Sequence, residues 1–367
     1  MNENSLERNQ IPTKKFVLIE LLIAILMFMV VFLSGVTNGL GRAVSAQIDN
    51  FGPLNYILSD DSDKNIPYSS ITSEDIEAVE EIDNIAYASL LIQRATISQT
   101  EGSDTLDITY FAVGHNGQEV LNPKTEGKSL RISDLKENEV ILDRSFQNEG
   151  IRLGDEVIDK TSKQKLTVVA FAQDAKYGYS EIGFVNSETY AGMRQQTDPN
   201  YQWRAQTIVT PNTVTSNDLT SNLIVADRNQ IIDNIPGYKA QNLTLRIITW
   251  VLLIASSAIL GVFFYILTLQ KLKQFGVLKA IGMPMSRITY IQLSQLTIVS
   301  LIGVAIGLGL AALVNPLLPP TVPAFITPQD NVAIAASFIL TSLLCGALSL
   351  LKIKKVDPIE VIGGNGE

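Results

Sequence analysis

The sequence offers few side chains that could act as catalysts or metal ligands. It contains a single histidine, His115, and a single cysteine, Cys345. His115 lies beside Gly114 in a stretch that predicts a surface turn, and Cys345 lies inside an apolar run, so no intrachain disulfide can form. No Cys/His cluster has the spacing of metal ligands, and no Gly-x-Ser-x-Gly motif occurs. We therefore expect no catalytic residue, no metal site and no intrinsic cofactor.

One stretch comes close to a phosphate-binding loop. Residues 122–129 read Asn-Pro-Lys-Thr-Glu-Gly-Lys-Ser, where such a loop reads G-x-x-x-x-G-K-S. Asn122 replaces the first glycine, and no strand leads directly into the segment. We reject it as a nucleotide site. If ATP powers this protein, a separate subunit must bind it.

Two aromatic stretches mix rings with a cation. They are Lys176-Tyr177-Gly178-Tyr179 and Tyr201-Gln202-Trp203-Arg204. Such groups suit a flat, apolar, anionic ligand, and a tyrosine oxygen can ligate haem iron. The alternative is surface tyrosines at loop edges. Met27 and Met29, in the first apolar run, carry soft thioethers that could line a route for such a ligand, or they could simply pack or face lipid.

Four apolar runs are long enough to cross a bilayer. Hydrophobic residues make up 46% of the chain, and the mean hydropathy is +0.19, which suggests membrane helices plus a sizeable water-soluble part. A bilayer crossing needs roughly 20 apolar residues. The predicted spans are residues 16–41, 247–269, 288–314 and 332–351.

The positions of the basic residues predict the orientation. Lys and Arg are enriched on the cytoplasmic side of spans. They cluster before the first span, between the second and third, and after the fourth, which places residues 1–15, 270–287 and 352–367 in the cytoplasm of a multi-pass plasma-membrane protein. Residues 42–246 and 315–331 are then outside. The net charge of −9 argues against a nucleic-acid partner.

The basic segment 270–287 predicts a short amphipathic helix. Phe275, Val277, Leu278 and Ile281 share one stripe, and Gly282 with the following Pro284 should end the helix. One interpretation is a charged cytoplasmic loop; the other is a helix that docks on a cytoplasmic partner.

Small residues form faces on two spans. Gly303, Gly307 and Gly309, with Ala305, Ala311 and Ala312, lie on the third, and Ser34-Gly35 and Asn38-Gly39 lie on the first. Small residues let helices approach closely in lipid. The faces could pack the four helices of one chain, but we favour a homodimer with its interface along them.

The segment outside the membrane is predicted to be a mixed α and β domain. Helices are expected to start at Ser73, Ser145, Ser187 and Asp227, and residues 238–245 should link the domain back to the membrane. The predicted strands are residues 85–98, 105–114, 140–142, 155–158, 165–171, 182–185, 206–209 and 222–225. The fold class is therefore an α+β membrane protein, with four transmembrane helices arranged 1+3 around a large outer domain.

This layout and three motifs resemble FtsX/MacB-type ABC transporter permeases. Gln274–Gly282 is similar to that family's E-x-G-V-L-K-A-L-G signature, and Val356–Ile362 to its D-P-x-E-A-L ending. Gly154–Val157 with Leu166–Val169 resembles the G-D-x-V…F-x-V-V-G hairpin of its outer, MacB-like domain. Within the family, the first span and Lys176–Tyr179 look like the HrtB-type hemin-export permeases.

The resemblance implies a partner and a mechanism. Two permease copies would pair with two cytosolic ATPase subunits, which bind the ATP, and the segment 270–287 would pass the motion of the ATPases to the membrane. Its apolar residues Phe275, Val277, Leu278 and Ile281 would sit in a groove of the ATPase, and Lys273 and Lys279 would meet the acidic rim of that groove. Gly276 and Gly282 belong to the same coupling segment.

The expected cargo is haem or another amphipathic toxic compound, with contacts at Lys176, Tyr177, Tyr179, Met27 and Met29. Two alternatives remain open. The protein could export antimicrobial peptides or macrolides, or it could transmit ATPase motion to an extracellular partner without moving a substrate.

Overall fold

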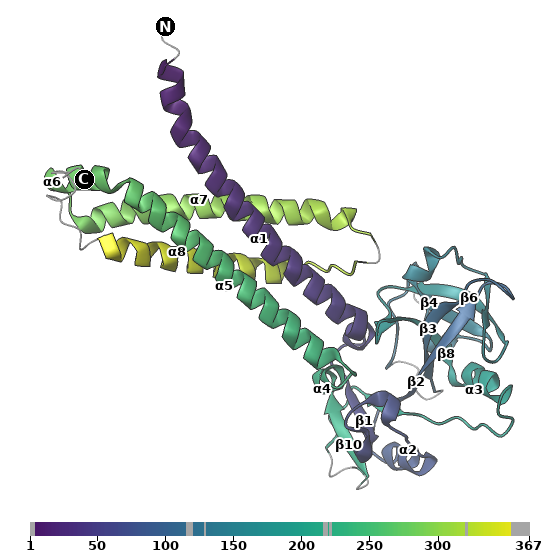
Figure 1. The fold of residues 1–367 in the computed structure, drawn as a ribbon. Helices are drawn as coiled ribbons and strands as arrows, with labels where there is room; N and C mark the ends of the chain where they lie inside the picture. Colours follow the sequence, from purple (N-terminus) through teal and green to yellow (C-terminus); the bar gives the residue numbers. More distant parts are fainter. Residues whose placement is uncertain are drawn as a thin grey trace. The chain divides into compact units, whose positions relative to one another are not determined.

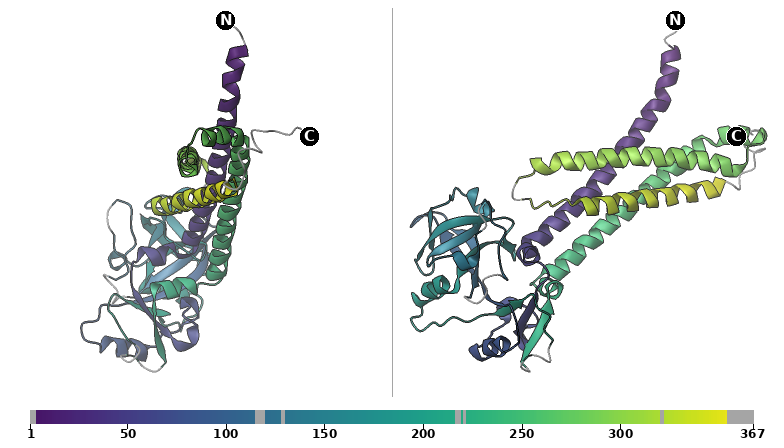
Figure 2. Two further views of the ribbon diagram at one scale, coloured as in Figure 1. Left: turned by 90° about the vertical axis from the view of Figure 1, so that its left-hand side faces the viewer. Right: turned by 180° about the vertical axis from the view of Figure 1, so that it is seen from behind.

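The structure is a computed structural model that describes residues 4–114, 120–127, 130–215, 219, 222–319 and 322–353. The chain divides into two compact units. One, the membrane unit, combines the residues up to Leu40 with those from Leu243 onward. The other, the outer domain, is Gly41–Asn242. Figures 1 and 2 trace the elements of both units. The C-terminal motif at residues 356–362 and His115 lie outside the described residues.

The membrane unit is built on four long helices. They are α1 (Asn4–Asn50), α5 (Tyr238–Gln270), α7 (Met285–Val314) and α8 (Pro328–Ile353). Each contains a stretch long and apolar enough to cross a membrane. Helices α7 and α8 run side by side (Figures 1 and 2). The predicted 1+3 arrangement of helices, with a large mixed α/β domain between the first and second, is confirmed.

The core of the membrane unit lies along one face of α1. Ile19, Ile23, Met27 and Val30 recur every three or four residues and are at most 2% exposed. They pack in one cluster with residues of the other three helices, including Leu260, Val304 and Phe338. Residues at this spacing share one helix face.

Glycines permit the closest contacts in this unit. A Cβ on Gly307 would lie 2.8 Å from the Ala24 carbonyl oxygen, and one on Gly303 would overlap the Ile23 side chain. A Cβ on Gly35 would lie 2.7 Å from Ile326, and one on Gly39 would overlap the Pro323 carbonyl oxygen. Phe325 N donates a hydrogen bond to Gly35 O at 2.8 Å.

These contacts correct the dimer prediction at four glycines. Gly35, Gly39, Gly303 and Gly307 are occupied by contacts inside one chain, so they cannot also form a dimer interface. Their small size serves helix and loop packing within the unit. On α7 only Ala305, Gly309 and Ala312 of the predicted face remain exposed. The homodimer itself stays a prediction.

The outer domain is a mixed sheet with helices. Its strands are β1 (Asn55–Ser59), β2 (Ala88–Ser98), β3 (Leu106–Val113), β4 (Glu139–Asp143), β5 (Glu156–Asp159), β6 (Lys165–Ala172), β7 (Lys176–Tyr177), β8 (Ser180–Asn186), β9 (Thr207–Thr210) and β10 (Leu223–Asp227). Its helices are α2 (Ser73–Glu80), α3 (Ser187–Gln195) and α4 (Arg228–Asp233). The order is β10-β1-β9-β2-β3-β8-β4-β6-β5, and β5 pairs again with β2, so part of the sheet closes on itself.

Both faces of the central strand β3 are buried. Tyr110 and Ala112 belong to one apolar cluster, and Phe111 and Val113 to another. Successive side chains of a strand point to opposite faces, so one strand contributes to two cores. The strand is therefore apolar at consecutive positions.

Local signals predicted most of these elements correctly. The predicted hairpin is β5–β6, with Val157 opposite Leu166. Helix α2 follows a capping box in which Thr72 and Asp75 satisfy each other's backbone N–H groups, so the cap is Thr72 and the helix starts at Ser73 as predicted.

Four elements differ from the sequence-based expectation. The helix expected at Ser145 is a short 3-10 turn, Arg144–Gln147. Strands β1 and β7 were not predicted. The predicted link 238–245 is helical, because α5 already begins at Tyr238, directly after Gly237 with φ +81°. Its polar residues suggested a linker, but Lys, Ala, Gln and Leu are good helix formers.

Candidate docking helix and ligand contacts

The segment between α5 and α7 forms a separate helix, α6 (Leu272–Ala280). Met283 N donates to Leu278 O and Gly282 N donates to Lys279 O, both at 3.0 Å, and Gly282 has φ +92°. This is a Schellman motif, in which a glycine takes the left-handed conformation at the helix end. Pro284 then caps α7. The predicted helix and its end at Gly282 are confirmed.

Helix α6 leaves apolar side chains open to solvent. Val277 is 55% exposed and Ile281 73% exposed, while Phe275 and Leu278 are half-buried. Gly276 is buried, and Lys279 and Gly282 are exposed. Val277 and Ile281 are four residues apart and so are neighbours on the same side of the turn. The apolar stripe is thus available for contact with another protein.

Lys271 ties the start of α6 to α7. Its Nζ donates to Gln295 Oε1 at 2.9 Å and to Gln292 Oε1 at 3.4 Å. Partial burial lowers the pKa of Lys271. Because the two glutamines are neutral, the tie is a set of hydrogen bonds to a cation rather than an ion pair. The start of α6 is thus held to α7 by side-chain hydrogen bonds.

The predicted ligand contacts Tyr177 and Tyr179 lie in different surroundings. Tyr177 is 6% exposed and packs edge-on against Phe111 at 5.5 Å between ring centroids. Burial raises the pKa of Tyr177. Tyr179 is 50% exposed, and its hydroxyl pairs with Gln241 Oε1. Burial also raises the pKa of Tyr179. Only Tyr179 presents its ring to a ligand from solvent.

The backbone conformation explains why Tyr177 is buried while Tyr179 is exposed. Tyr177 pairs with Ser180, so Gly178 and Tyr179 form a two-residue hairpin turn, with φ of +58° and +67°. Positive φ at both positions is typical of a type I′ turn, which places its residues at the tip. Gly178 N and Tyr179 N donate to Val44 O and Ala43 O of α1. The stretch thus also serves as a structural contact within the outer domain.

Lys176 faces an acidic side chain, and Met27 and Met29 differ in burial. Lys176 Nζ lies 3.7 Å from Glu181 Oε1 across the hairpin. Met27 is fully buried in the core of the membrane unit, whereas Met29 is 45% exposed. Two positions along a helix turn the direction by about 200°. Met27 and Met29 therefore cannot line one route from a single helix.

Within the described ranges, no group of three His, Cys, Asp or Glu residues is arranged to hold a metal ion. Lys128 and Ser129 of the rejected phosphate loop fall outside these ranges. The side chain of Lys273 is likewise outside what the structure describes.

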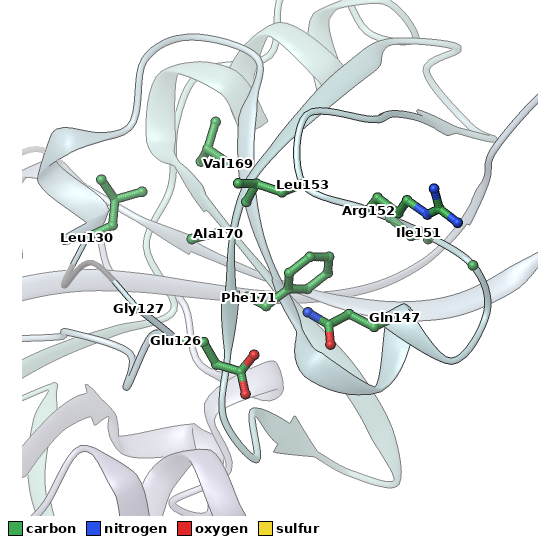
Figure 3. A pocket seen from close by; sticks show the side chains of 11 residues that line it. Glu126, Gly127, Leu130, Gln147, Ile151, Arg152, Leu153, Val169, Ala170 and Phe171 are labelled. Atoms are coloured by element: carbon green, nitrogen blue, oxygen red, sulfur yellow. The ribbon is translucent and has the colours of Figure 1, made fainter.

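The outer domain contains a cavity that the sequence did not indicate (Figure 3). It has a volume of about 700 Å³, and Phe171, Ala170 and Ile151 form its buried apolar wall. Glu126, which lies 3.1 Å from Arg144, and Arg152 contribute polar groups. Leu153, which is 65% exposed, also lines the cavity, next to Gly154 with φ +86°.

The four long helices, the outer domain and the exposed helix α6 together fit the class of membrane permease subunits. Residues 16–226 match the MacB-like periplasmic core domain, and residues 246–358 match the FtsX-like permease C-terminal domain. The chain therefore belongs to the FtsX/MacB-type ABC transporter permeases, as its motifs predicted. A permease of an ABC transport system implies an ATPase partner.

The chain is similar over almost its whole length to hemin permeases. It is 25% identical over 350 residues to the putative hemin transport system permease protein HrtB of Staphylococcus haemolyticus, covering 95% of this chain and 96% of that protein. The corresponding Staphylococcus epidermidis protein is 24% identical, with the same coverage. An uncharacterized ABC transporter permease of Mycobacterium tuberculosis is 24% identical, covering 92% of each chain.

A solved structure aligns with part of this chain. The extracellular domain of YknZ, a noncanonical ABC-type transporter from Gram-positive bacteria, superposes with a TM-score of 0.32 and 15% identity, covering 47% of this chain and 98% of that one.

Proposed function

We propose that this protein is the permease subunit of a transporter that exports haem or a similar amphipathic compound, powered by a separate cytosolic ATPase. The observation that carries the proposal is the similarity to hemin permeases over 95% of the chain. In this proposal two copies assemble in the plasma membrane, and both termini of each are cytoplasmic. ATP is bound by the partner, and haem is cargo.

Helix α6 is the proposed docking element. Val277 and Ile281 enter a groove on the ATPase, with Phe275 and Leu278 beside them, and Lys273 and Lys279 meet its acidic rim. Burying an exposed Val or Ile side chain stabilises an interface by about 1.5–3 kcal/mol. ATP-driven closure of the ATPases would then move α6, and Lys271 would pass part of that motion to α7.

Of the predicted cargo contacts, the proposal keeps as direct contacts only those that are not buried. Tyr179 and Met29 are open to a flat apolar molecule, and Lys176 lies next to Tyr177 and carries a cation suited to a carboxylate. Tyr177 and Met27 are buried and would support these contacts by packing. A tyrosine oxygen can coordinate haem iron only if the iron can reach it.

The test is ATP hydrolysis by the purified permease with its ATPase in lipid, with and without low-micromolar hemin. An apolar peptide antibiotic serves as the control compound. Stimulation by hemin alone supports haem export. Stimulation by the peptide alone supports peptide export, and stimulation by neither favours a mechanical transmitter; both results would reject haem as cargo.

A spectral titration tests the contact residues. Hemin added to the wild-type protein should shift the haem absorption band, and Tyr179→Phe should weaken that shift. Tyr177→Phe is the matched control and should leave it unchanged, because its hydroxyl lies in a buried environment. Equal loss in both variants would contradict the assignment of Tyr179.

A further inference from the structure

A second cavity lies within the membrane unit, among α1, α5 and α8. Its volume is about 370 Å³. Val30, Leu253, Ile334 and Trp250 give it apolar surface. Besides Ala333, the remaining lining residues are polar or charged, namely Ser34, Thr37, Asn38, Arg246, Thr249, Asp330 and Ser337. A cavity with both kinds of surface suits an amphiphile.

Asp330 is fixed at the wall of this cavity by neutral donors. Its Oδ2 accepts a hydrogen bond from Asn38 Nδ2 at 2.6 Å and another from the Thr327 hydroxyl. Asp330 N donates to Thr327 Oγ1 at 3.2 Å, so the Thr327 side chain caps the first turn of α8. Among the described residues no donor reaches the other oxygen, Oδ1. The carboxylate therefore keeps acceptor capacity for a ligand.

Arg246 supplies an available cation at the same cavity. Its side chain is exposed, and it forms no ion pair or hydrogen bond with any residue that the structure describes. Trp250 is four residues further along α5, on the same face, and is 60% exposed. Arginine and tryptophan are typical anchors at the boundary between lipid and water. Both line the cavity.

We propose that this cavity binds the headgroup of a phospholipid that combines an anionic phosphate with hydrogen-bond donors, as phosphatidylglycerol does. The phosphate pairs with Arg246, since the carboxylate of Asp330 repels it from the other wall. The headgroup hydroxyls donate to Asp330 Oδ1, and an acyl chain lies along Trp250 and Leu253. The site is independent of the cargo proposed above.

The chain carries its own reporter for this site. It has two tryptophans, Trp203 in the outer domain and Trp250 at the cavity. The variant Trp203→Phe leaves Trp250 as the only indole, and brominated acyl chains quench indole fluorescence at contact range. The full chain is placed in bilayers of phosphatidylcholine with increasing brominated phosphatidylglycerol, or increasing brominated phosphatidylcholine at equal bromine content.

Phosphatidylglycerol should quench Trp250 at a mole fraction about fivefold lower than phosphatidylcholine, the ratio expected for one added cation contact. Arg246→Gln should bring the ratio close to one, and Arg246→Lys should largely retain the preference. The matched control is Lys239→Gln, which removes an exposed cation of the same helix that does not line the cavity; the ratio should persist.

Each opposite result overturns the proposal. Equal quenching by the two lipids in the wild-type background would show that the cavity has no headgroup preference. Persistence of the preference in Arg246→Gln, or its loss in Lys239→Gln, would show that general surface charge causes it. Displacement by inorganic phosphate in the buffer would assign the site to the free anion and not to a lipid.

Discussion

The helices of the membrane unit pack closely at glycines, whereas a core of the outer domain is built around large aromatic side chains. Gly307 and Gly39 allow backbones to touch in the membrane unit. In the outer domain Phe111 lies 5.9 Å from Phe184 and 5.5 Å from Tyr177, ring centroid to centroid. Lipid offers no hydrophobic driving force between helices, so close packing must supply it; in water, burial of large apolar surface does.

Buried polar groups follow the same division. In the outer domain Asp159 Oδ2 accepts from Ser162 N at 2.7 Å and from Ser162 Oγ at 2.8 Å, and Asp143 Oδ2 accepts from Ala175 N at 2.6 Å. Asp159 closes its own turn, whereas Asp143 pins a segment 32 residues further along the chain to its strand. In the membrane unit most hydroxyls bond the carbonyl one turn back, as Thr268 does to Phe264 at 2.6 Å. Such bonds stay local and hold no second helix.

The largest expected effect is truncation of the aromatic core of the outer domain. Phe111→Ala should lower the free energy of unfolding by about 3–5 kcal/mol, because it removes buried surface and leaves a cavity. Denaturant unfolding of the full chain measures this. Tyr68→Ala is the control, since Tyr68 is 70% exposed, and should change little. Similar losses in both variants would contradict the core assignment.

The next largest effect is expected when a side chain is added at a closely packed glycine of the membrane unit. Gly307→Val should destabilise the bundle by about 1–3 kcal/mol through overpacking against Ala24 and Met27. Gly309→Val, two residues along the same helix, meets nothing within 4 Å and is the matched control. Thermal unfolding in detergent compares the two. If Gly309→Val is as destabilising, the open face of α7 is covered by another surface, which would support a dimer there.

A smaller effect is expected from the polar contact between α1 and α8. Asp330→Ala removes the hydrogen bonds that the carboxylate accepts from Asn38 and from the Thr327 hydroxyl, and should cost about 1–2 kcal/mol of stability. Asn331→Ala is the control, because the hydrogen bond from Asn331 N to Thr327 O uses only backbone atoms and survives the change. Equal melting temperatures for Asp330→Ala and wild type would show that hydrogen bonds between helices contribute nothing here.

The smallest effect on stability is expected at α6. Ile281→Ser should leave the free energy of unfolding within about 0.5 kcal/mol of wild type, as for other exposed sites. The same change should weaken binding of the ATPase about tenfold, a loss typical of an interface anchor. Co-purification and ATP hydrolysis measure it. Gln274→Ser, an exposed polar position on α6, is the control, and equal weakening there would reject the apolar stripe as the contact.

Local sequence signals were sufficient to predict much of the fold. The four apolar runs, the Schellman end at Gly282 and the β5–β6 hairpin depend on residues close together in the chain, and each was predicted correctly. The prediction that residues 238–245 form a linker was wrong, because a polar composition does not exclude a helix. The sequence did not indicate the two cavities, because the residues that line each one come from distant segments.

By itself the sequence determined which segments are apolar enough to cross a membrane, where α6 ends and which family motifs are present, because composition and short-range geometry suffice for these. Only the tertiary structure decided which neighbours are buried. Met27 is buried and Met29 is exposed, and Tyr177 lies in the core while Tyr179 lies at a hairpin tip. The space beside Gly307 is occupied by neighbouring atoms, whereas the space beside Gly309 is empty. Packing partners fix how a helix is rotated about its axis and which face of a strand is buried, and the sequence alone does not reveal those partners.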